Sequence, residues 1–222
     1  REKLRRLLAA GIDHDQIEQT YSISKRIDAE ELALAHTNLL ITSTRQESEE
    51  QYARYGRFSS DIVEIIPPGV DLNRFYSTDL NSEEEEKELD KLFKPFLINR
   101  KLPPLLAISR AVRRKNIPAL LETYGRSSVL QQRHNLILIL GCREDSRQLD
   151  KQQREVFQQV FELVDKYNLY GKVAYPKQHK RDQIPSIYRW VANRKGLFVN
   201  PALTEPFGLT LLEAASCGLP MV

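Results

Sequence analysis

Short apolar runs alternate with longer amphipathic segments throughout the second half of the chain. The apolar runs have the length of buried strands and lie at residues 105–109, 136–140, 173–175 and 197–200. Helical periodicity marks the segments between and after them, at residues 117–124, 148–167, 185–192 and 209–217. This alternation favours an α/β fold in which a doubly wound, Rossmann-like parallel sheet is covered by helices on both faces.

The first part of the chain has a different pattern, in which helices precede one short apolar run. Helical spacing covers residues 2–10, and a long amphipathic helix is expected at residues 16–36. A short buried strand is expected at residues 39–42. Thr44 and Glu47 then have the spacing of a capping box, which opens another helix. These elements predict part of a second α/β domain.

A turn and a charged stretch separate the two patterns. Residues 65–71 read IIPPGVD, which is typical of a turn after a short strand. Residues 80–95 include four consecutive glutamates, at positions 83–86, without the spacing of metal ligands. We interpret this stretch as a solvated helix or an insertion, and assign it no chemistry.

Residues 196–222 carry the strongest candidate chemistry. A buried strand, a proline-broken loop and a helix follow one another; Gly218 ends the helix, and a second strand begins at Pro220. In open α/β sheets, ligands bind at the carboxyl ends of the strands. The loop at this end carries Glu205, and the helix that follows carries Glu213.

The spacing of these two glutamates leaves two interpretations open. A helix N-terminus attracts phosphate, and Gly208 lets the backbone approach a ligand closely. Glu205 and Glu213 would then accept hydrogen bonds from hydroxyls of the hexose and the ribose of a nucleotide sugar. Alternatively, Thr210 and Glu213 form a capping box, and Glu205 is an ordinary loop acid.

Residues 200–213, NPALTEPFGLTLLE, resemble the signature of retaining nucleotide-sugar glycosyltransferases of the two-domain GT-B fold. The amino-acid sequence of this segment is most similar to that of the sucrose-phosphate synthase family, which residues 26–31 and 43–47 also resemble. The resemblance implies retaining transfer of glucose from a nucleoside-diphosphate glucose to fructose-6-phosphate. It implies that Glu205 holds the glucose hydroxyls and Glu213 the ribose. The backbone amides implied to bind the phosphate and sugar are those of Phe207, Gly208 and Leu209.

A basic segment, residues 109–116, follows the first strand of the second pattern. Arg110 and Lys115 stand where the family places the arginine and lysine that bind the donor diphosphate, although Ala-Val lies between them where many relatives carry Pro-Asp. The resemblance makes both residues, with Glu205, the catalytic candidates, because fixed cations stabilise a departing phosphate without a metal. Taken alone, a basic cluster of this kind is more often a solvated loop.

Two further loops resemble family loops near the donor nucleotide. Residues 141–145 contain Arg143, and residues 175–180 contain Lys177 and His179. The resemblance implies that Arg143 and Lys177 contact the donor, although a surface arginine also explains Arg143. We expect a structural role for His179, because no partner carboxylate is apparent for it.

Two candidates lie in the first part of the chain. Arg45, at a strand-to-helix turn, is the candidate contact for the acceptor's phosphate, and a surface arginine in a first helical turn fits it equally well. Asp13 and Asp15 superficially match an acidic metal-binding pair. A helix start explains them better, so no metal site is expected.

The resemblance also divides the chain into domains. Residues 1–63 would be the end of the acceptor-side domain, residues 64–100 the interdomain connection with a charged insertion, and residues 101–222 a truncated donor-binding domain. Because the chain starts at Arg1 and stops within an apparent strand at Val222, we expect a fragment. The resemblance implies a glycine-rich loop and an acceptor-side histidine that this sequence does not contain, so we expect no transfer by these residues alone.

Composition narrows the class of protein. The 33 basic and 30 acidic residues nearly balance, which disfavours nucleic-acid binding, and no apolar run approaches the roughly 20 residues of a membrane span. Two cysteines are too few for a disulfide framework. We expect a cytoplasmic protein, without a cofactor, whose partners are a nucleoside-diphosphate glucose and fructose-6-phosphate. The alternatives are sucrose synthase, another retaining GT-B glycosyltransferase and a non-catalytic nucleotide-sugar-binding protein.

Overall fold

The computed structural model describes residues 1–78, 83–143 and 145–222, which fall into two compact units. The first unit spans Arg1–Gly69 and the second Val70–Val222. Glu144, in the predicted loop at residues 141–145, lies outside the described residues. So do residues 80–82, at the start of the predicted charged stretch.

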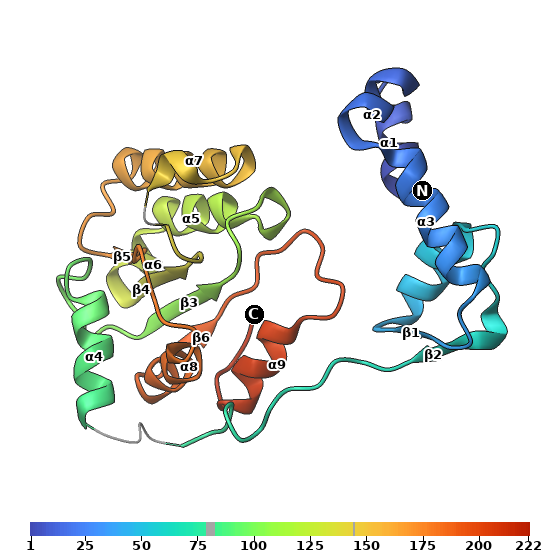
Figure 1. Cartoon of the computed structure of the whole chain (residues 1–222). Helices are drawn as coiled ribbons and strands as arrows, with labels where there is room; N and C mark the ends of the chain where they lie inside the picture. Colours follow the sequence, from blue (N-terminus) through green and yellow to red (C-terminus); the bar gives the residue numbers. More distant parts are fainter. Residues whose placement is uncertain (79–82, 144) are drawn as a thin grey trace. The chain divides into compact units, whose positions relative to one another are not determined.

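A parallel sheet forms the centre of the second unit (Figure 1). Among the described residues it has four strands in the order β5-β4-β3-β6: β3 (Pro104–Ile108), β4 (Asn135–Ile139), β5 (Val173–Ala174) and β6 (Leu197–Phe198). Leu106 of β3 pairs with Ile137 on one side and with Phe198 on the other. Phe198 also forms a parallel bridge to Met221, in the segment where a further strand was predicted.

Helices cover both faces of this sheet. They are α4 (Glu83–Phe93), α5 (Ile117–Arg126), α6 (Ser128–Arg133), α7 (Lys151–Lys166), α8 (Gln183–Asn193) and α9 (Leu209–Ser216). Successive strand residues point to opposite faces. Leu105 and Ala107 pack in one core with α5 and α7, and Leu106 packs in the other with α4, α8 and α9. The predicted doubly wound α/β fold is therefore confirmed.

The charged stretch before the sheet is part of the second unit. The boundary between the units lies after Gly69, so residues 70–78 and 83–100 belong to the same unit as the sheet. Within α4, Leu89 and Phe93 are buried, and the Phe93 ring lies 5.0 Å from the ring of Trp190 in α8. The solvated-helix interpretation was wrong, because an apolar stripe follows the acidic first turn.

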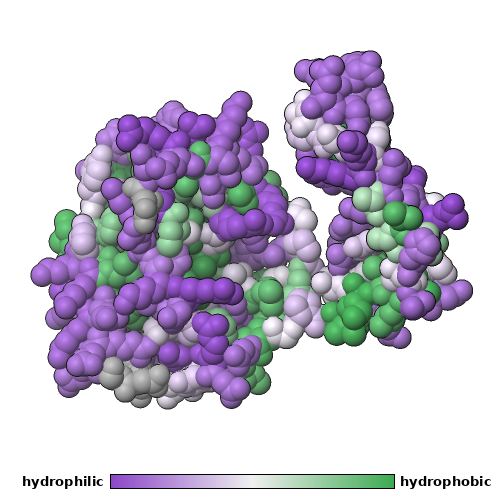
Figure 2. All heavy atoms as spheres, in the orientation of Figure 1, coloured by the Kyte–Doolittle hydropathy of each residue, from purple (hydrophilic) through white to green (hydrophobic). Residues whose placement is uncertain are grey.

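The first unit consists of short elements. Its helices and strands are α1 (Glu2–Ala9), α2 (His14–Tyr21), α3 (Ile23–Ala35), β1 (Leu40–Thr42), a π-helix (Glu47–Gln51), two 3₁₀ turns (Tyr52–Arg54 and Ser60–Ile62) and β2 (Val63–Ile65). β1 and β2 pair in parallel. Hydrophobic side chains gather over them (Figure 2), and Ile41 and Ile65 are exposed by 56% and 40%.

The single long helix predicted at residues 16–36 was wrong. Ser22 has a φ of 45°, which ends α2 and separates it from α3. The carboxylate of Glu18 accepts hydrogen bonds from both the backbone N–H and the hydroxyl of Ser24, and so stabilises this break. The helix-start interpretation of Asp13 is confirmed, because its carboxylate accepts from the backbone N–H groups of Asp15 and Gln16.

Candidate functional site

The sheet order places the candidate loops at one edge of the second unit. Because its strands are parallel, the loops that follow β3, β4, β5 and β6 all leave at the carboxyl edge. From β3 the chain continues outward through β4 to β5, and then returns through α8 to place β6 on the other side of β3. Open α/β sheets bind ligands at such a change of direction. The loops after β3 and β6 therefore border the expected crevice.

Lys115 and Glu205 meet at this edge of the sheet. The short 3₁₀ turn Arg113–Lys115 follows β3, and its lysine forms a hydrogen-bonded ion pair with the Glu205 carboxylate in the loop after β6. The two side chains are only 12% and 21% exposed. The backbone N–H of Leu203 also donates to the carbonyl of Arg114 at 2.9 Å. These bonds hold the two loops together, although 90 residues separate the charged pair in the chain.

The surroundings of Glu205 favour its charged form. Burial by itself raises the pKa of this carboxyl, but the hydrogen bond and charge of Lys115 act in the opposite direction and, with Asn200 and the charge of Arg114, leave its pKa lowered. Asn200 Nδ2 donates to the same carboxylate oxygen at 3.4 Å. The site thus contains a carboxylate that is already paired with a cation.

Arg110 lies on the same loop as Lys115 but is arranged differently. Its side chain is exposed and forms no hydrogen bond or ion pair with the described residues. Ala111, which follows it, is completely buried and anchors the loop in the core beneath α5 and α7. Arg110 is therefore an exposed cation on an anchored loop.

The start of α9 lies beside Glu205. Gly208 is the N-cap residue with a φ of 83°, and a side chain placed there would lie 3.6 Å from Glu205 Cγ. The segment Phe207, Gly208 and Leu209 therefore brings the first backbone amides of the helix close to the Lys115–Glu205 pair. A backbone N–H group at a helix start is a general receptor for phosphate oxygens.

Glu213 lies one turn further along α9 and is half-buried. The capping-box alternative was wrong: the helix begins at Gly208, and the Glu213 carboxylate accepts a hydrogen bond from the Tyr188 hydroxyl at 3.2 Å. Burial raises the pKa of Glu213, against the opposing effects of this hydrogen bond and the charge of Arg74. Sequence reasoning missed Tyr188; its signal was a tyrosine within a buried helical run, since a buried hydroxyl requires a partner.

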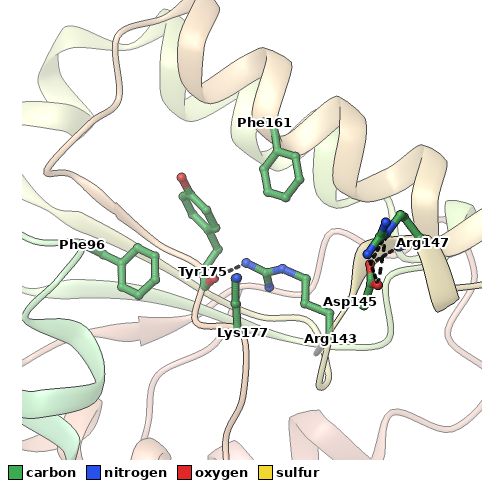
Figure 3. A pocket seen from close by; sticks show the side chains of 7 residues that line it. All are labelled: Phe96, Arg143, Asp145, Arg147, Phe161, Tyr175 and Lys177. Atoms are coloured by element: carbon green, nitrogen blue, oxygen red, sulfur yellow. Dashed lines mark hydrogen bonds and ion pairs between the residues drawn. The ribbon is translucent and has the colours of Figure 1, made fainter.

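The loops after β4 and β5 surround a cavity of about 580 Å³ (Figure 3). Its lining residues are Phe96, Arg143, Asp145, Arg147, Phe161, Tyr175 and Lys177. Lys177 is exposed, but the Arg143 side chain is buried and donates hydrogen bonds to the backbone carbonyls of Tyr175 and Pro176. This geometry argues against the predicted direct contact between Arg143 and the donor, because the guanidinium is already engaged with protein.

His179 lines a neighbouring cavity of about 360 Å³, together with Cys142, Gln178, Lys180 and Gln183. Its Nδ1 atom is buried without a hydrogen-bond partner among the described residues. Burial lowers the pKa of His179 and favours the neutral ring. Among the described residues, no group of three or more His, Cys, Asp or Glu side chains could hold a metal ion.

Arg45 lies in the first unit at the predicted turn after β1. Thr44 Oγ1 accepts from the backbone N–H of Glu47 at 3.1 Å, and the Glu47 carboxylate accepts from that of Ser43 at 2.8 Å. The Thr44 half of the predicted capping box is thus confirmed, whereas Glu47 bonds the residue before Thr44. The Arg45 side chain is 78% exposed and has a long ion pair, 3.8 Å, with Glu49.

The described part of the chain contains no helix with the length and hydropathy of a membrane span.

Comparison with known proteins identifies the family of the second unit. The family model for glycosyl transferases group 1 matches residues 89–222. Over its full length the chain is 41% identical to a "Probable sucrose-phosphate synthase" of Beta vulgaris and 38% identical to "Sucrose-phosphate synthase 4" of Arabidopsis thaliana. It spans about a quarter of the length of these relatives, 24% and 25% respectively.

A solved structure supports the same fold. The structure of Anabaena Alr3699/HepE in complex with UDP and glucose aligns with 89% of this chain and 47% of its own, with a TM-score of 0.66 and 16% sequence identity. The predicted GT-B type of fold is thus confirmed by likeness of structure as well as by the family match. The chain belongs to the glycosyl transferases group 1 family.

Proposed function

We propose that the whole protein is a retaining hexosyltransferase that moves glucose from a nucleoside-diphosphate glucose to fructose-6-phosphate and forms sucrose-6-phosphate. The observation that carries this proposal is the pairing of Lys115 with Glu205 at the start of α9, where the sheet order changes direction. The similarity over the full chain to sucrose-phosphate synthases supports the choice of substrates. UDP-glucose is the donor to test first, and the cytoplasm is the proposed location.

The donor would lie along the crevice between the loops after β3 and β6. Lys115 and the exposed Arg110 neutralise the diphosphate, and the amides at the start of α9 bind its oxygens. Glu205 accepts hydrogen bonds from hydroxyl groups of the glucose, and Glu213, which Tyr188 holds in place, accepts hydrogen bonds from those of the ribose. Lys115 is then shared between Glu205 and a phosphate oxygen, which fixes the sugar relative to its leaving group.

Fixed cations supply the electrostatic stabilisation that the departing diphosphate needs, and we propose that no metal takes part. No protein nucleophile is required, because the departing phosphate oxygen takes the proton of the acceptor hydroxyl on the same face of the glucose. The protein contributes position and charge. Arg45, exposed at its turn, is the proposed contact for the phosphate of fructose-6-phosphate.

Substitution of Lys115 tests this function in the whole protein. Lys115→Met removes one charge-assisted hydrogen bond to the donor, so we expect the Kd for UDP-glucose to rise about 10- to 100-fold. Arg113→Met is the matched control: it lies on the same turn but pairs with Glu155 at 2.6 Å. Calorimetry with UDP-, ADP- and GDP-glucose measures binding.

Product formation from fructose-6-phosphate and from free fructose then separates the proposed acceptor from that of sucrose synthase. We expect Arg45→Ala to raise the KM for fructose-6-phosphate and to change no other constant. Binding of no nucleotide sugar, or equal losses for Lys115→Met and Arg113→Met, would contradict the proposal. Donor binding without transfer to either acceptor would instead indicate a nucleotide-sugar-binding protein.

A further inference from the structure

Three consecutive carbonyl groups after β5 accept hydrogen bonds from one residue of the neighbouring loop. Arg143 Nη2 donates to the carbonyl of Tyr175 at 2.7 Å, and Nη1 donates to that of Pro176 at 3.0 Å. The backbone N–H of Arg143 donates to the carbonyl of Lys177 at 2.8 Å. The guanidinium lies beside the rings of Tyr175 and Phe161, 5.7 and 5.8 Å from their centres, and points toward the β5 loop (Figure 3).

Proline explains why this segment needs such a donor. The ladder between β4 and β5 ends with the pair of Ile137 and Ala174. Pro176 has no N–H group and cannot continue it. The carbonyl groups that follow still require donors when they are buried, and the planar fork of an arginine supplies two from a single side chain.

Arg143 also differs from a ligand-binding cation because it is buried. The residue is only 6% exposed, and its guanidinium lies 4.6 Å from the centre of the Phe157 ring in α7. It has no carboxylate partner among the described residues. A buried charge is costly unless it is well satisfied, so its contacts with two carbonyls and with aromatic faces account for its retention.

The residues that Arg143 positions lead directly into a cavity. Gln178, His179 and Lys180 follow the three bonded carbonyls and line the cavity of about 360 Å³. Cys142, which precedes Arg143, lines the same cavity, and its thiol donates to the carbonyl of His179 at 3.4 Å. Two walls of the cavity are therefore joined through Arg143 and its immediate neighbour.

The cavity lies within reach of the diphosphate site. β5 is separated from β3 by one strand, and neighbouring strands lie roughly 4.8 Å apart, so the ends of β5 and β3 lie about 10 Å apart along the sheet edge. A nucleoside with an attached diphosphate can bridge this span.

We propose that Arg143 is a positioning residue that holds residues 175–180 in the conformation that receives the nucleoside part of the donor, without contacting the donor itself. This inference rests on the proposed function. It predicts that loss of the guanidinium weakens binding of the donor but not of the acceptor. Residues 175–180 must then become ordered when the donor binds, and this ordering reduces the free energy of binding.

Arg143→Met in the whole protein tests the inference, because methionine keeps an apolar stem against Phe157 and removes both side-chain hydrogen bonds. We expect the Kd and KM for UDP-glucose to rise about tenfold or more. The kcat and the KM for fructose-6-phosphate stay within about twofold. Arg147→Met is the matched control: this arginine of the same loop is 88% exposed and pairs with Asp145, so its loss leaves the donor KM unchanged.

Two more variants test whether Arg143 acts by holding the loop, by its charge or by its packing against α7. Arg143→Lys keeps the charge but offers no planar fork, so its donor KM stays raised; full recovery in this variant would overturn the proposal. Phe157→Leu loosens α7 and leaves the hydrogen bonds to the carbonyls in place. If this variant loses as much Tm as Arg143→Met and its KM for UDP-glucose rises as much, the role of Arg143 is merely structural. An unchanged donor KM in Arg143→Met also overturns the inference. Failure of the unsubstituted protein to bind any nucleotide sugar would refute the proposed function instead.

Discussion

At the scale of single residues, the ion pair between Lys115 and Glu205 determines the electrostatics of the candidate site. Each side chain is mostly buried and is neutralised by the other. Removal of one partner would leave the other charge unpaired in a poorly solvated place, which is more costly than the loss of an exposed ion pair. A bound phosphate can share Lys115 only because this lysine is already held beside the loop that carries Glu205.

The pH dependence of stability follows from the lowered pKa of Glu205. A carboxyl with a lowered pKa stabilises the fold above its ordinary value of 4.5, and this stabilisation is lost as the pH falls below that value. Glu205→Gln should therefore destabilise the chain by about 1–2 kcal/mol near neutral pH and by less in acid. Urea unfolding of both proteins across this pH range measures the difference, and a difference that does not change with pH would contradict the assignment.

Lys115 and Glu205 were singled out through the resemblance to retaining glycosyltransferases, and the parallel strands bring the loops that carry them to one edge of the sheet. The placement of Arg143 could not be foreseen, because the burial of a guanidinium depends on α7 and on the carbonyls after β5. Tyr188 was missed for the same reason, since its partner Glu213 lies on another helix.

At the scale of elements, the start of α9 is the most constrained feature of the site. Gly208 has a φ of 83°, and an added Cβ would lie 3.0 Å from Leu211 Cδ1. The backbone can reach this left-handed conformation cheaply only with glycine. The position of the helix start, and with it the first free amides, therefore depends on this one residue.

Gly208→Ala should destabilise the second unit by about 1–2 kcal/mol, because alanine is strained at this φ and also crowds Leu211. The affinity for the donor should fall as well, since the amides of the first turn shift. Thermal unfolding and calorimetry measure the two effects. Gly69→Ala is the control, because a Cβ there meets nothing within 4 Å and its φ is not positive; a similar loss in both variants would refute this account.

At the scale of the whole molecule, the two units differ in how well their cores are built. The second unit buries apolar residues on both faces of its sheet. In the first unit, all of whose residues are described, the buried apolar side chains are Ile17, Ile23 and Leu34, and Ile41 and Ile65 remain exposed on its strands. A two-stranded parallel sheet with so little cover lacks the burial needed for independent stability.

Residues 70–222 produced alone should therefore unfold cooperatively, whereas residues 1–69 alone should not. Circular dichroism during heating measures both. We expect a single sigmoidal transition for the second unit, with an unfolding enthalpy of about 0.7 kcal/mol per residue, and a gradual change for the first. A cooperative transition in residues 1–69 would show that this unit has a sufficient core of its own.

The sequence by itself determined the α/β class, the positions of the strands and the loops that carry the candidate chemistry, because these depend on local periodicity and on the residues that end each element. Tertiary structure decided which charges pair, which are buried and where the long helix predicted at residues 16–36 breaks. Lys115 meets Glu205, and Arg143 is enclosed beneath α7, only because strand order and helix packing bring distant segments together. Contacts of that kind depend on the whole fold, and no local pattern of residues encodes them.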